Sequence, residues 1–150
     1  MTDVQVPVRA FAGSPGGRVV FWSQLIALTA YLLGSYVILV AAVIHRRDPG
    51  ALLRPGLERL GDPKASFPIV GPDSEWNPVV WVFGLSRALG FFVYPLSAAA
   101  LLLGAAGLLR TRRRDRALFR RIAAVTAAWL VVGIVAVTPY GAHLLTWLLD

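Results

Sequence analysis

The sequence predicts an all-α integral membrane protein, a three-transmembrane-helix bundle with a proline-rich extracytoplasmic loop and short interfacial helices. Of its 150 residues, 57% are hydrophobic, whereas soluble domains contain roughly 45–50% apolar residues. The apolar residues form long runs, and a helix needs about 20 such residues to cross the hydrocarbon core of a bilayer. A proline-rich segment separates the first run from the second, so we expect that segment to lie outside the membrane.

The first apolar run extends over residues 19–44, which are 26 positions without a charge. A helix of this length covers about 39 Å, more than the roughly 30 Å core of the membrane. The apolar part of a cleavable signal peptide has only about 7–15 residues. We therefore expect an uncleaved transmembrane helix, preceded by a flexible cytoplasmic tail over residues 1–18.

The outer loop is expected over residues 45–77, where five prolines prevent the formation of a long helix. A short helix is predicted at residues 55–60, because Pro55 suits a first helical turn and Gly61 follows the end. The rest of the loop is expected to be extended.

The second apolar run covers residues 78–109 and is interrupted only by Arg87. We divide it there into a span over residues 88–109 and an apolar extension over residues 78–86. The extension either lies at the membrane interface or lengthens the helix, and Arg87 reaches toward water from the mouth of the span. In the alternative, one longer helix buries Arg87 in the membrane at a cost of a few kcal/mol unless it is paired. Pro95 is expected to kink this helix.

The third span is predicted at about residues 122–138. Pro139 interrupts the apolar sequence, which then continues over residues 139–149. This last segment either continues the helix beyond a kink or forms a short interfacial helix.

The orientation follows from a basic loop over residues 110–121. This loop and the N-terminal tail together carry nine basic residues, against five in the outer loop. Positive charge favours the cytoplasmic side, so the N-terminus is predicted to be cytoplasmic and the C-terminus extracytoplasmic. The arginine-rich, lysine-poor composition indicates a bacterial inner (plasma) membrane. We expect seven arginines of the loop to fix the membrane topology, and in the alternative they bind anionic lipid headgroups. These residues are Arg110, Arg112, Arg113, Arg114, Arg116, Arg120 and Arg121.

Small residues recur at helical spacing along the predicted spans. Such residues let helix backbones approach closely inside a membrane. They are expected to pack the bundle internally, with docking to another subunit as the alternative. The positions are Ala30 and Gly34 in the first span, Gly90, Ser97, Ala100, Gly104 and Gly107 in the second, and Gly133 in the third.

The candidate ligand-binding residues are expected at the outer interface, where the predicted topology brings His45, Arg87, Tyr140 and His143. An arginine there suits an anionic headgroup, and a histidine can transfer a proton. His45 adjoins two arginines whose charge repels a metal cation, so we expect neither a metal nor another cofactor. The sequence has no cysteine and no recognisable catalytic motif.

The leading hypothesis for function is a small non-enzymatic accessory or structural subunit of a larger membrane complex. The first alternative is a lipid- or quinone-binding membrane protein, with or without enzymatic activity, whose site lies at the outer interface. The second is a homo-oligomeric small transporter. The expected partners are the lipid bilayer and other membrane subunits or further copies of the chain. Nucleic acid is not expected, because the net charge of +7 is explained by the basic loop beside two spans.

Overall fold

The structure is a computed structural model that describes residues 15–52, 57–61, 78–112 and 115–149, and all of its regular elements there are helical. Three helices are long and apolar enough to cross a membrane, which agrees with the number of spans predicted. The elements are α1 (Pro15–Leu32), η1 (Leu33–Val37), α2 (Ile38–Arg46), η2 (Pro49–Leu52), η3 (Leu57–Leu60), α3 (Pro78–Phe91), α4 (Val93–Thr111), α5 (Arg116–Ala136) and α6 (Pro139–Leu149).

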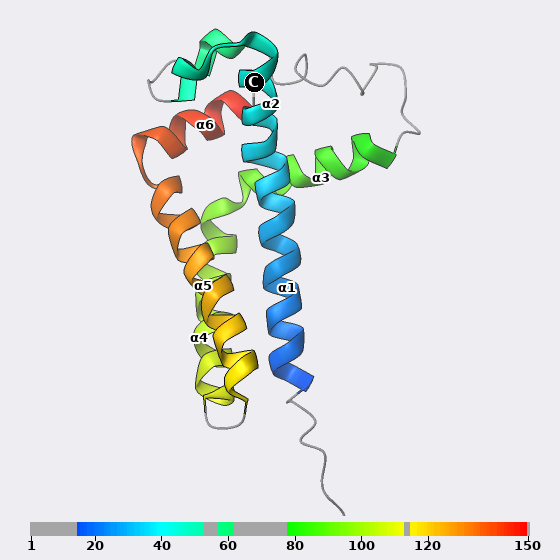
Figure 1. Cartoon of the computed structure of the whole chain (residues 1–150), viewed down its shortest axis with the longest axis vertical. Helices are drawn as coiled ribbons and strands as arrows, with labels where there is room; N and C mark the ends of the chain where they lie inside the picture. The colour runs from blue at the N-terminus through cyan, green and yellow to red at the C-terminus, as the bar shows by residue number, and fades with distance from the viewer. Residues whose placement is uncertain (1–14, 53–56, 62–77, 113–114, 150) are drawn as a thin grey trace, which may run out of the picture.

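The first candidate span is one continuous rod of 32 residues, Pro15–Arg46, formed by α1, the π-helical turn η1 and α2 (Figure 1). Residues 15–18 are helical, so the described helix begins inside the tail predicted for residues 1–18; the first 14 residues lie outside the description. The rod ends at Arg47, whose φ of 53° is left-handed, a common way to stop a helix. Its length of about 48 Å exceeds the roughly 30 Å membrane core, so α2 extends beyond it.

The second run bends between α3 and α4, at Phe92, with φ of −90° and ψ of 20°. The cause is Pro95, which has no N–H to donate and whose ring opposes the carbonyl four residues earlier. The break therefore lies inside the predicted span of residues 88–109, and the candidate span is Val93–Thr111 instead. Arg87 falls on a separate helix, α3, which runs across the direction of α1 (Figure 1).

The turn between α4 and α5 is shorter than the predicted basic loop of residues 110–121. Asp115 caps α5, because its Oδ1 accepts hydrogen bonds from the backbone N–H groups of Ala117 at 3.0 Å and Leu118 at 2.9 Å. As a result, α4 continues to Thr111 and α5 begins at Arg116.

The chain also bends between α5 and α6. Thr138 donates a hydrogen bond from Oγ1 to the Val135 carbonyl at 2.6 Å and accepts one from the Gly141 N–H at 3.2 Å. Pro139 follows as the first residue of α6, a position where its missing N–H costs nothing. The segment 139–149 is therefore a helix of its own.

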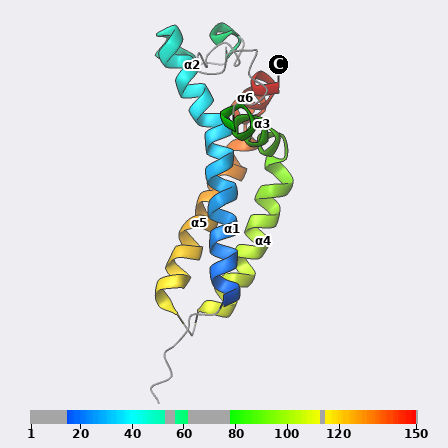
Figure 2. The same ribbon diagram turned by 90° about the vertical axis from the view of Figure 1, so that its right-hand side faces the viewer.

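Two hydrophobic cores result from this arrangement. In the first, α1, α4 and α5 lie side by side (Figures 1 and 2) around the fully buried Trp129. The second, which we call the cap, lies at the end where α2 extends past the others, and it is formed by α2, η2, η3 and α6 around Leu60 and Trp147. Tyr36 packs against both cores.

Polar contacts within the cap connect the described part of the outer loop to α2 and α6. The Trp147 Nε1 donates a hydrogen bond to the Gly61 carbonyl at 2.9 Å, and the Arg46 Nε donates one to the Leu60 carbonyl at 3.3 Å. Arg59 forms an ion pair with Asp48 at 2.6 Å, but exposed pairs of this kind stabilise a protein only weakly. The predicted short helix at residues 55–60 corresponds to η3 at Leu57–Leu60, while residues 62–77 lie outside the described residues.

The small residues of α4 lie against α5 and α1. A Cβ at Gly104 would collide with the Thr126 side chain, and one at Gly107 would meet Val20 at 3.3 Å and Ile122 at 3.5 Å. Across the same contact, a Cβ at Gly133 would meet the Ser97 Cβ at 3.4 Å. Of the other small positions singled out in the sequence, Gly34, Gly90 and Ala100 are buried and Ala30 is half-buried.

Substitution of Gly104 by alanine should lower the thermal stability of the purified protein. The added methyl group overpacks the contact with Thr126, and overpacking costs about 1–3 kcal/mol. Gly90→Ala is the matched control, since a Cβ there has no atom within 4 Å, and it should leave the midpoint unchanged or raise it. Thermal unfolding followed by circular dichroism in detergent measures both, and equal midpoints for the two variants would contradict the close α4–α5 packing.

Candidate functional site

Gln24 occupies the centre of the contact between α1, α4 and α5. Its side chain is 3% exposed, its Nε2 donates to the Ala100 carbonyl on α4 at 2.7 Å, and its Oε1 accepts from the Thr126 hydroxyl on α5 at 3.3 Å. The Trp129 Nε1 donates to the Gln24 backbone carbonyl at 3.2 Å. One residue of α1 is therefore hydrogen-bonded to both neighbouring helices.

These hydrogen bonds satisfy an amide that would be costly to bury among apolar side chains without partners. Both ends of the Gln24 amide are used in helix–helix contacts, so it serves packing rather than a ligand. The sequence interpretation did not single out Gln24. The available signal was that it is the only side-chain amide in the uncharged run of residues 19–44.

Replacement of Gln24 by leucine should destabilise the protein by about 1–2 kcal/mol, since two interhelical hydrogen bonds of roughly 0.6–1 kcal/mol each are lost. The matched control is Thr29→Leu on the exposed side of the same helix, which should have little effect. Stability measured by thermal unfolding in the same detergent separates the two. A Gln24→Leu protein as stable as the wild type would show that the amide does not hold the helices together.

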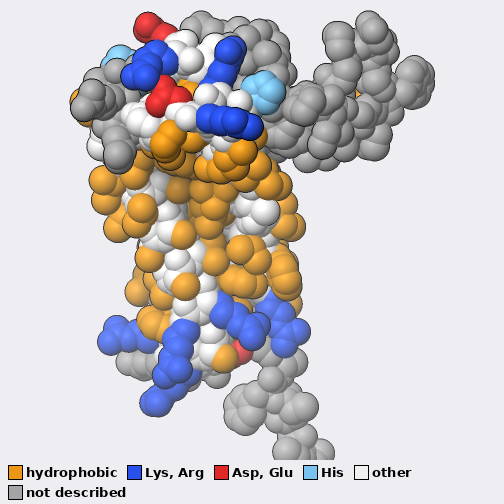
Figure 3. Space-filling model, turned by 45° about the horizontal axis from the view of Figure 1, so that its top comes forward, with side chains coloured by type: hydrophobic (Ala, Val, Ile, Leu, Met, Phe, Trp, Pro, Cys, Tyr) orange, Lys and Arg blue, Asp and Glu red, His pale blue; other side chains and the backbone are white. Residues whose placement is uncertain are grey.

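The four residues predicted for the outer interface do not form one site. His45 and His143 are exposed, while Arg87 and Tyr140 are half-buried. The two pale-blue histidine side chains lie on opposite sides of the upper end of the molecule (Figure 3). Among the described residues no hydrogen bond or ion pair joins any two of the four, and no group of three or more histidine, cysteine or acidic residues is placed to hold a metal ion.

All four tyrosines of the chain lie close together, near the bend between α3 and α4 and the bend between α5 and α6. Tyr31 and Tyr36 meet edge-on with ring centroids 6.2 Å apart, and the Tyr94 hydroxyl donates to the Ala136 carbonyl at 3.0 Å. Tyr140 packs against the cap beside Tyr36, and burial raises the pKa of the Tyr140 phenol. Only Tyr140 was among the predicted site residues.

A crevice of about 10 Å³ opens beside this tyrosine cluster, a volume that suits about one water molecule. Two hydroxyl-bearing residues line it, Tyr31 and Ser35, and the Ser35 hydroxyl donates to the Tyr31 carbonyl at 2.6 Å. The remaining lining is apolar, with Gly90, Val93 and Leu144 contributed by α3, α4 and α6. The lining residues carry no formal charge, so the crevice suits an uncharged group.

The opposite end of the molecule is strongly basic. Figure 3 shows blue arginine side chains at both ends of the described part of the chain, separated by an apolar belt. The described arginines of the predicted topology set are all exposed: Arg110, Arg112, Arg116, Arg120 and Arg121. Arg113 and Arg114 lie outside the described residues.

Comparison with known proteins gives no relative from which a function can be transferred. No protein-family model, no curated protein and no solved structure matches this chain.

Proposed function

We propose that the chain is an integral protein of a bacterial inner membrane, crossed by α1, α4 and α5, with the turn between α4 and α5 in the cytoplasm. The exposed arginines beside this turn support that orientation, because such charge favours the cytoplasmic side. Large apolar side chains on the outward faces support insertion: Leu102 is 73% exposed and Leu109 is 77% exposed. Exposure of these side chains to lipid has no free-energy cost, whereas in water they would form an extensive exposed apolar surface.

Single cysteines test this topology directly, since the natural chain contains none. A membrane-impermeant maleimide added to intact spheroplasts should label His143→Cys, which is exposed on α6, but not Arg120→Cys, which is exposed on α5. After permeabilisation both should react. The reverse pattern would show that the protein is inserted the other way round, and labelling of both in intact spheroplasts would show that neither site is on the cytoplasmic side.

We further infer that the protein acts as a non-enzymatic accessory subunit whose helices pack on those of a partner in the membrane. The observation that carries this proposal is the outward face of α4, where Ala98, Ala99, Ala105 and Ala106 are all exposed. The inward face of α4 is also made of small residues, so internal packing does not account for both faces. Small residues seven positions apart suit a left-handed helix contact, in which backbones approach closely.

Purification in mild detergent tests the proposal. The wild-type protein should carry a stoichiometric companion, and Ala98→Leu combined with Ala105→Leu should lose it, because the larger side chains block close approach. The matched control places leucines at Ala124 and Ala127, which are exposed on α5, and should retain the companion. A wild-type protein that migrates alone would contradict the accessory role, and a companion identical to the chain would favour the homo-oligomeric transporter instead.

A second candidate function is binding of a membrane lipid or quinone at the crevice beside Tyr31 and Ser35. The observation in its favour is that two hydroxyl-bearing residues line an otherwise apolar crevice at the bends. Its small volume places this candidate second, since a quinone ring enters only if the surrounding leucines move. Organic extraction of the same purified sample distinguishes the two: a lipid or quinone at one equivalent per chain supports the crevice, and its absence supports the accessory role alone.

A further inference from the structure

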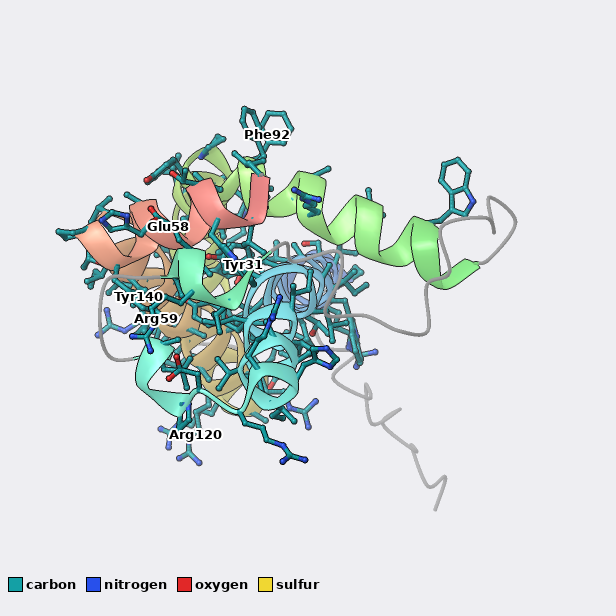
Figure 4. The ribbon with its side chains drawn as sticks, turned by 90° about the horizontal axis from the view of Figure 1, so that it is seen from above. Tyr31, Glu58, Arg59, Phe92, Arg120 and Tyr140 are labelled. Atoms are coloured by element: carbon teal, nitrogen blue, oxygen red, sulfur yellow. The ribbon has the colours of Figure 1, made fainter. Side chains whose placement is uncertain are left out.

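Helix α3 runs sideways from the packed helices. Figure 1 shows it running sideways from α1, and the view from above in Figure 4 shows it pointing away from α1, α4 and α5. It contacts α1, η1 and α6, and Gly90 near its end is buried. Helix α3 has 14 residues, Pro78–Phe91, and it projects sideways from the packed helices as an arm (Figure 1).

Three large apolar side chains of this arm are exposed. Trp81 is 71% exposed, Leu85 is 65% exposed and Phe91 is 54% exposed. The sequence of α3 contains a single charged residue, Arg87, and a single hydroxyl, that of Ser86. A helix resting on a membrane surface normally has a strongly polar face toward water. Because α3 has none, it fits an apolar surrounding better than the water-facing side of an interface.

The position of the arm matches the outer limit of the proposed bilayer. From Thr111 to Val93, α4 is about 28 Å long, close to the roughly 30 Å thickness of the hydrocarbon core. Helix α3 joins α4 at the Val93 end of this distance. Phe92, between the two helices, is 53% exposed and points outward (Figure 4). The apolar surface of the arm is thus continuous with the outward faces of the candidate spans.

We propose that α3 is an in-plane membrane helix, submerged in the outer leaflet, with Arg87 bound to a lipid phosphate. Lipid acyl chains cover the exposed surface of α3. This assignment rests on the membrane insertion proposed above. Arg87 is half-buried and makes no hydrogen bond or ion pair in the part of the chain that the structure describes. Its long side chain can lie along the apolar helix and bring the guanidinium to headgroup level.

Tryptophan fluorescence in vesicles tests the depth of α3. The protein is reconstituted in phosphatidylcholine–phosphatidylglycerol vesicles with or without acyl-chain bromine, which quenches nearby indoles, and iodide is added separately to quench indoles in water. Trp81→Phe should remove a measurable part of the bromine-quenchable emission and none of the iodide-quenchable emission. Trp22→Phe, which removes a 57% exposed indole on α1, should also reduce bromine quenching, whereas Trp147→Phe in the cap should not.

The outcomes separate this proposal from the membrane insertion on which it rests. If Trp22 is quenched by bromine and Trp81 by iodide, α3 lies in water and the in-plane proposal is overturned while the spans remain. If neither quencher reaches Trp81, protein covers α3, which overturns lipid as the occupant. If bromine reaches neither Trp22 nor Trp81, insertion itself has failed.

Discussion

The fold depends on the satisfaction of one buried amide. Gln24 is surrounded by apolar helices, where an unpaired amide is costly, and both its nitrogen and its oxygen find partners, on α4 and α5 respectively. The Trp129 indole adds a bond from α5 back to the Gln24 backbone. In the membrane insertion proposed above, apolar burial supplies little net attraction between helices that face lipid, so hydrogen bonds and close packing would decide which faces meet. The small residues of α4 make that close packing feasible.

Two bends of the chain redirect α3 and α6. Pro95 breaks the helix before Val93, and Thr138 with Pro139 separates α5 from α6. Both bends lie about 28–32 Å from the basic end, close to the expected thickness of the hydrocarbon. Helices α3 and α6 therefore turn aside at one level, and the first rod continues past it as α2, which packs against α6 in the cap. Because the bends lie at the same level, the tyrosine cluster and the crevice beside it form there.

The sequence was sufficient to predict what depends on local composition. Uncharged runs gave three membrane-length helices, and Pro139 marked a change of direction. The kink caused by Pro95 was predicted, but the boundary between the extension and the span was placed at Arg87, whereas the break lies at Phe92, in the turn that precedes the proline. Long-range contacts were beyond a single sequence: the partners of Gln24 are 76 and 102 residues away. The prediction that His45 meets His143 relied on their equal depth in the membrane. Equal depth does not determine the direction in which each side chain points from its helix.

Gln24 is sequestered between three helices, and its side-chain amide can be observed directly. The chain has two glutamines, Gln5 and Gln24, so labelling with ¹⁵N-glutamine gives a simple spectrum that a Gln5→Ser variant assigns. In lipid bilayers, solid-state NMR should find that the Gln24 side-chain N–H protons exchange slowly with D₂O and show a through-space contact with the Ala100 carbonyl carbon. Rapid exchange of these protons, with no contact to Ala100, would contradict the account.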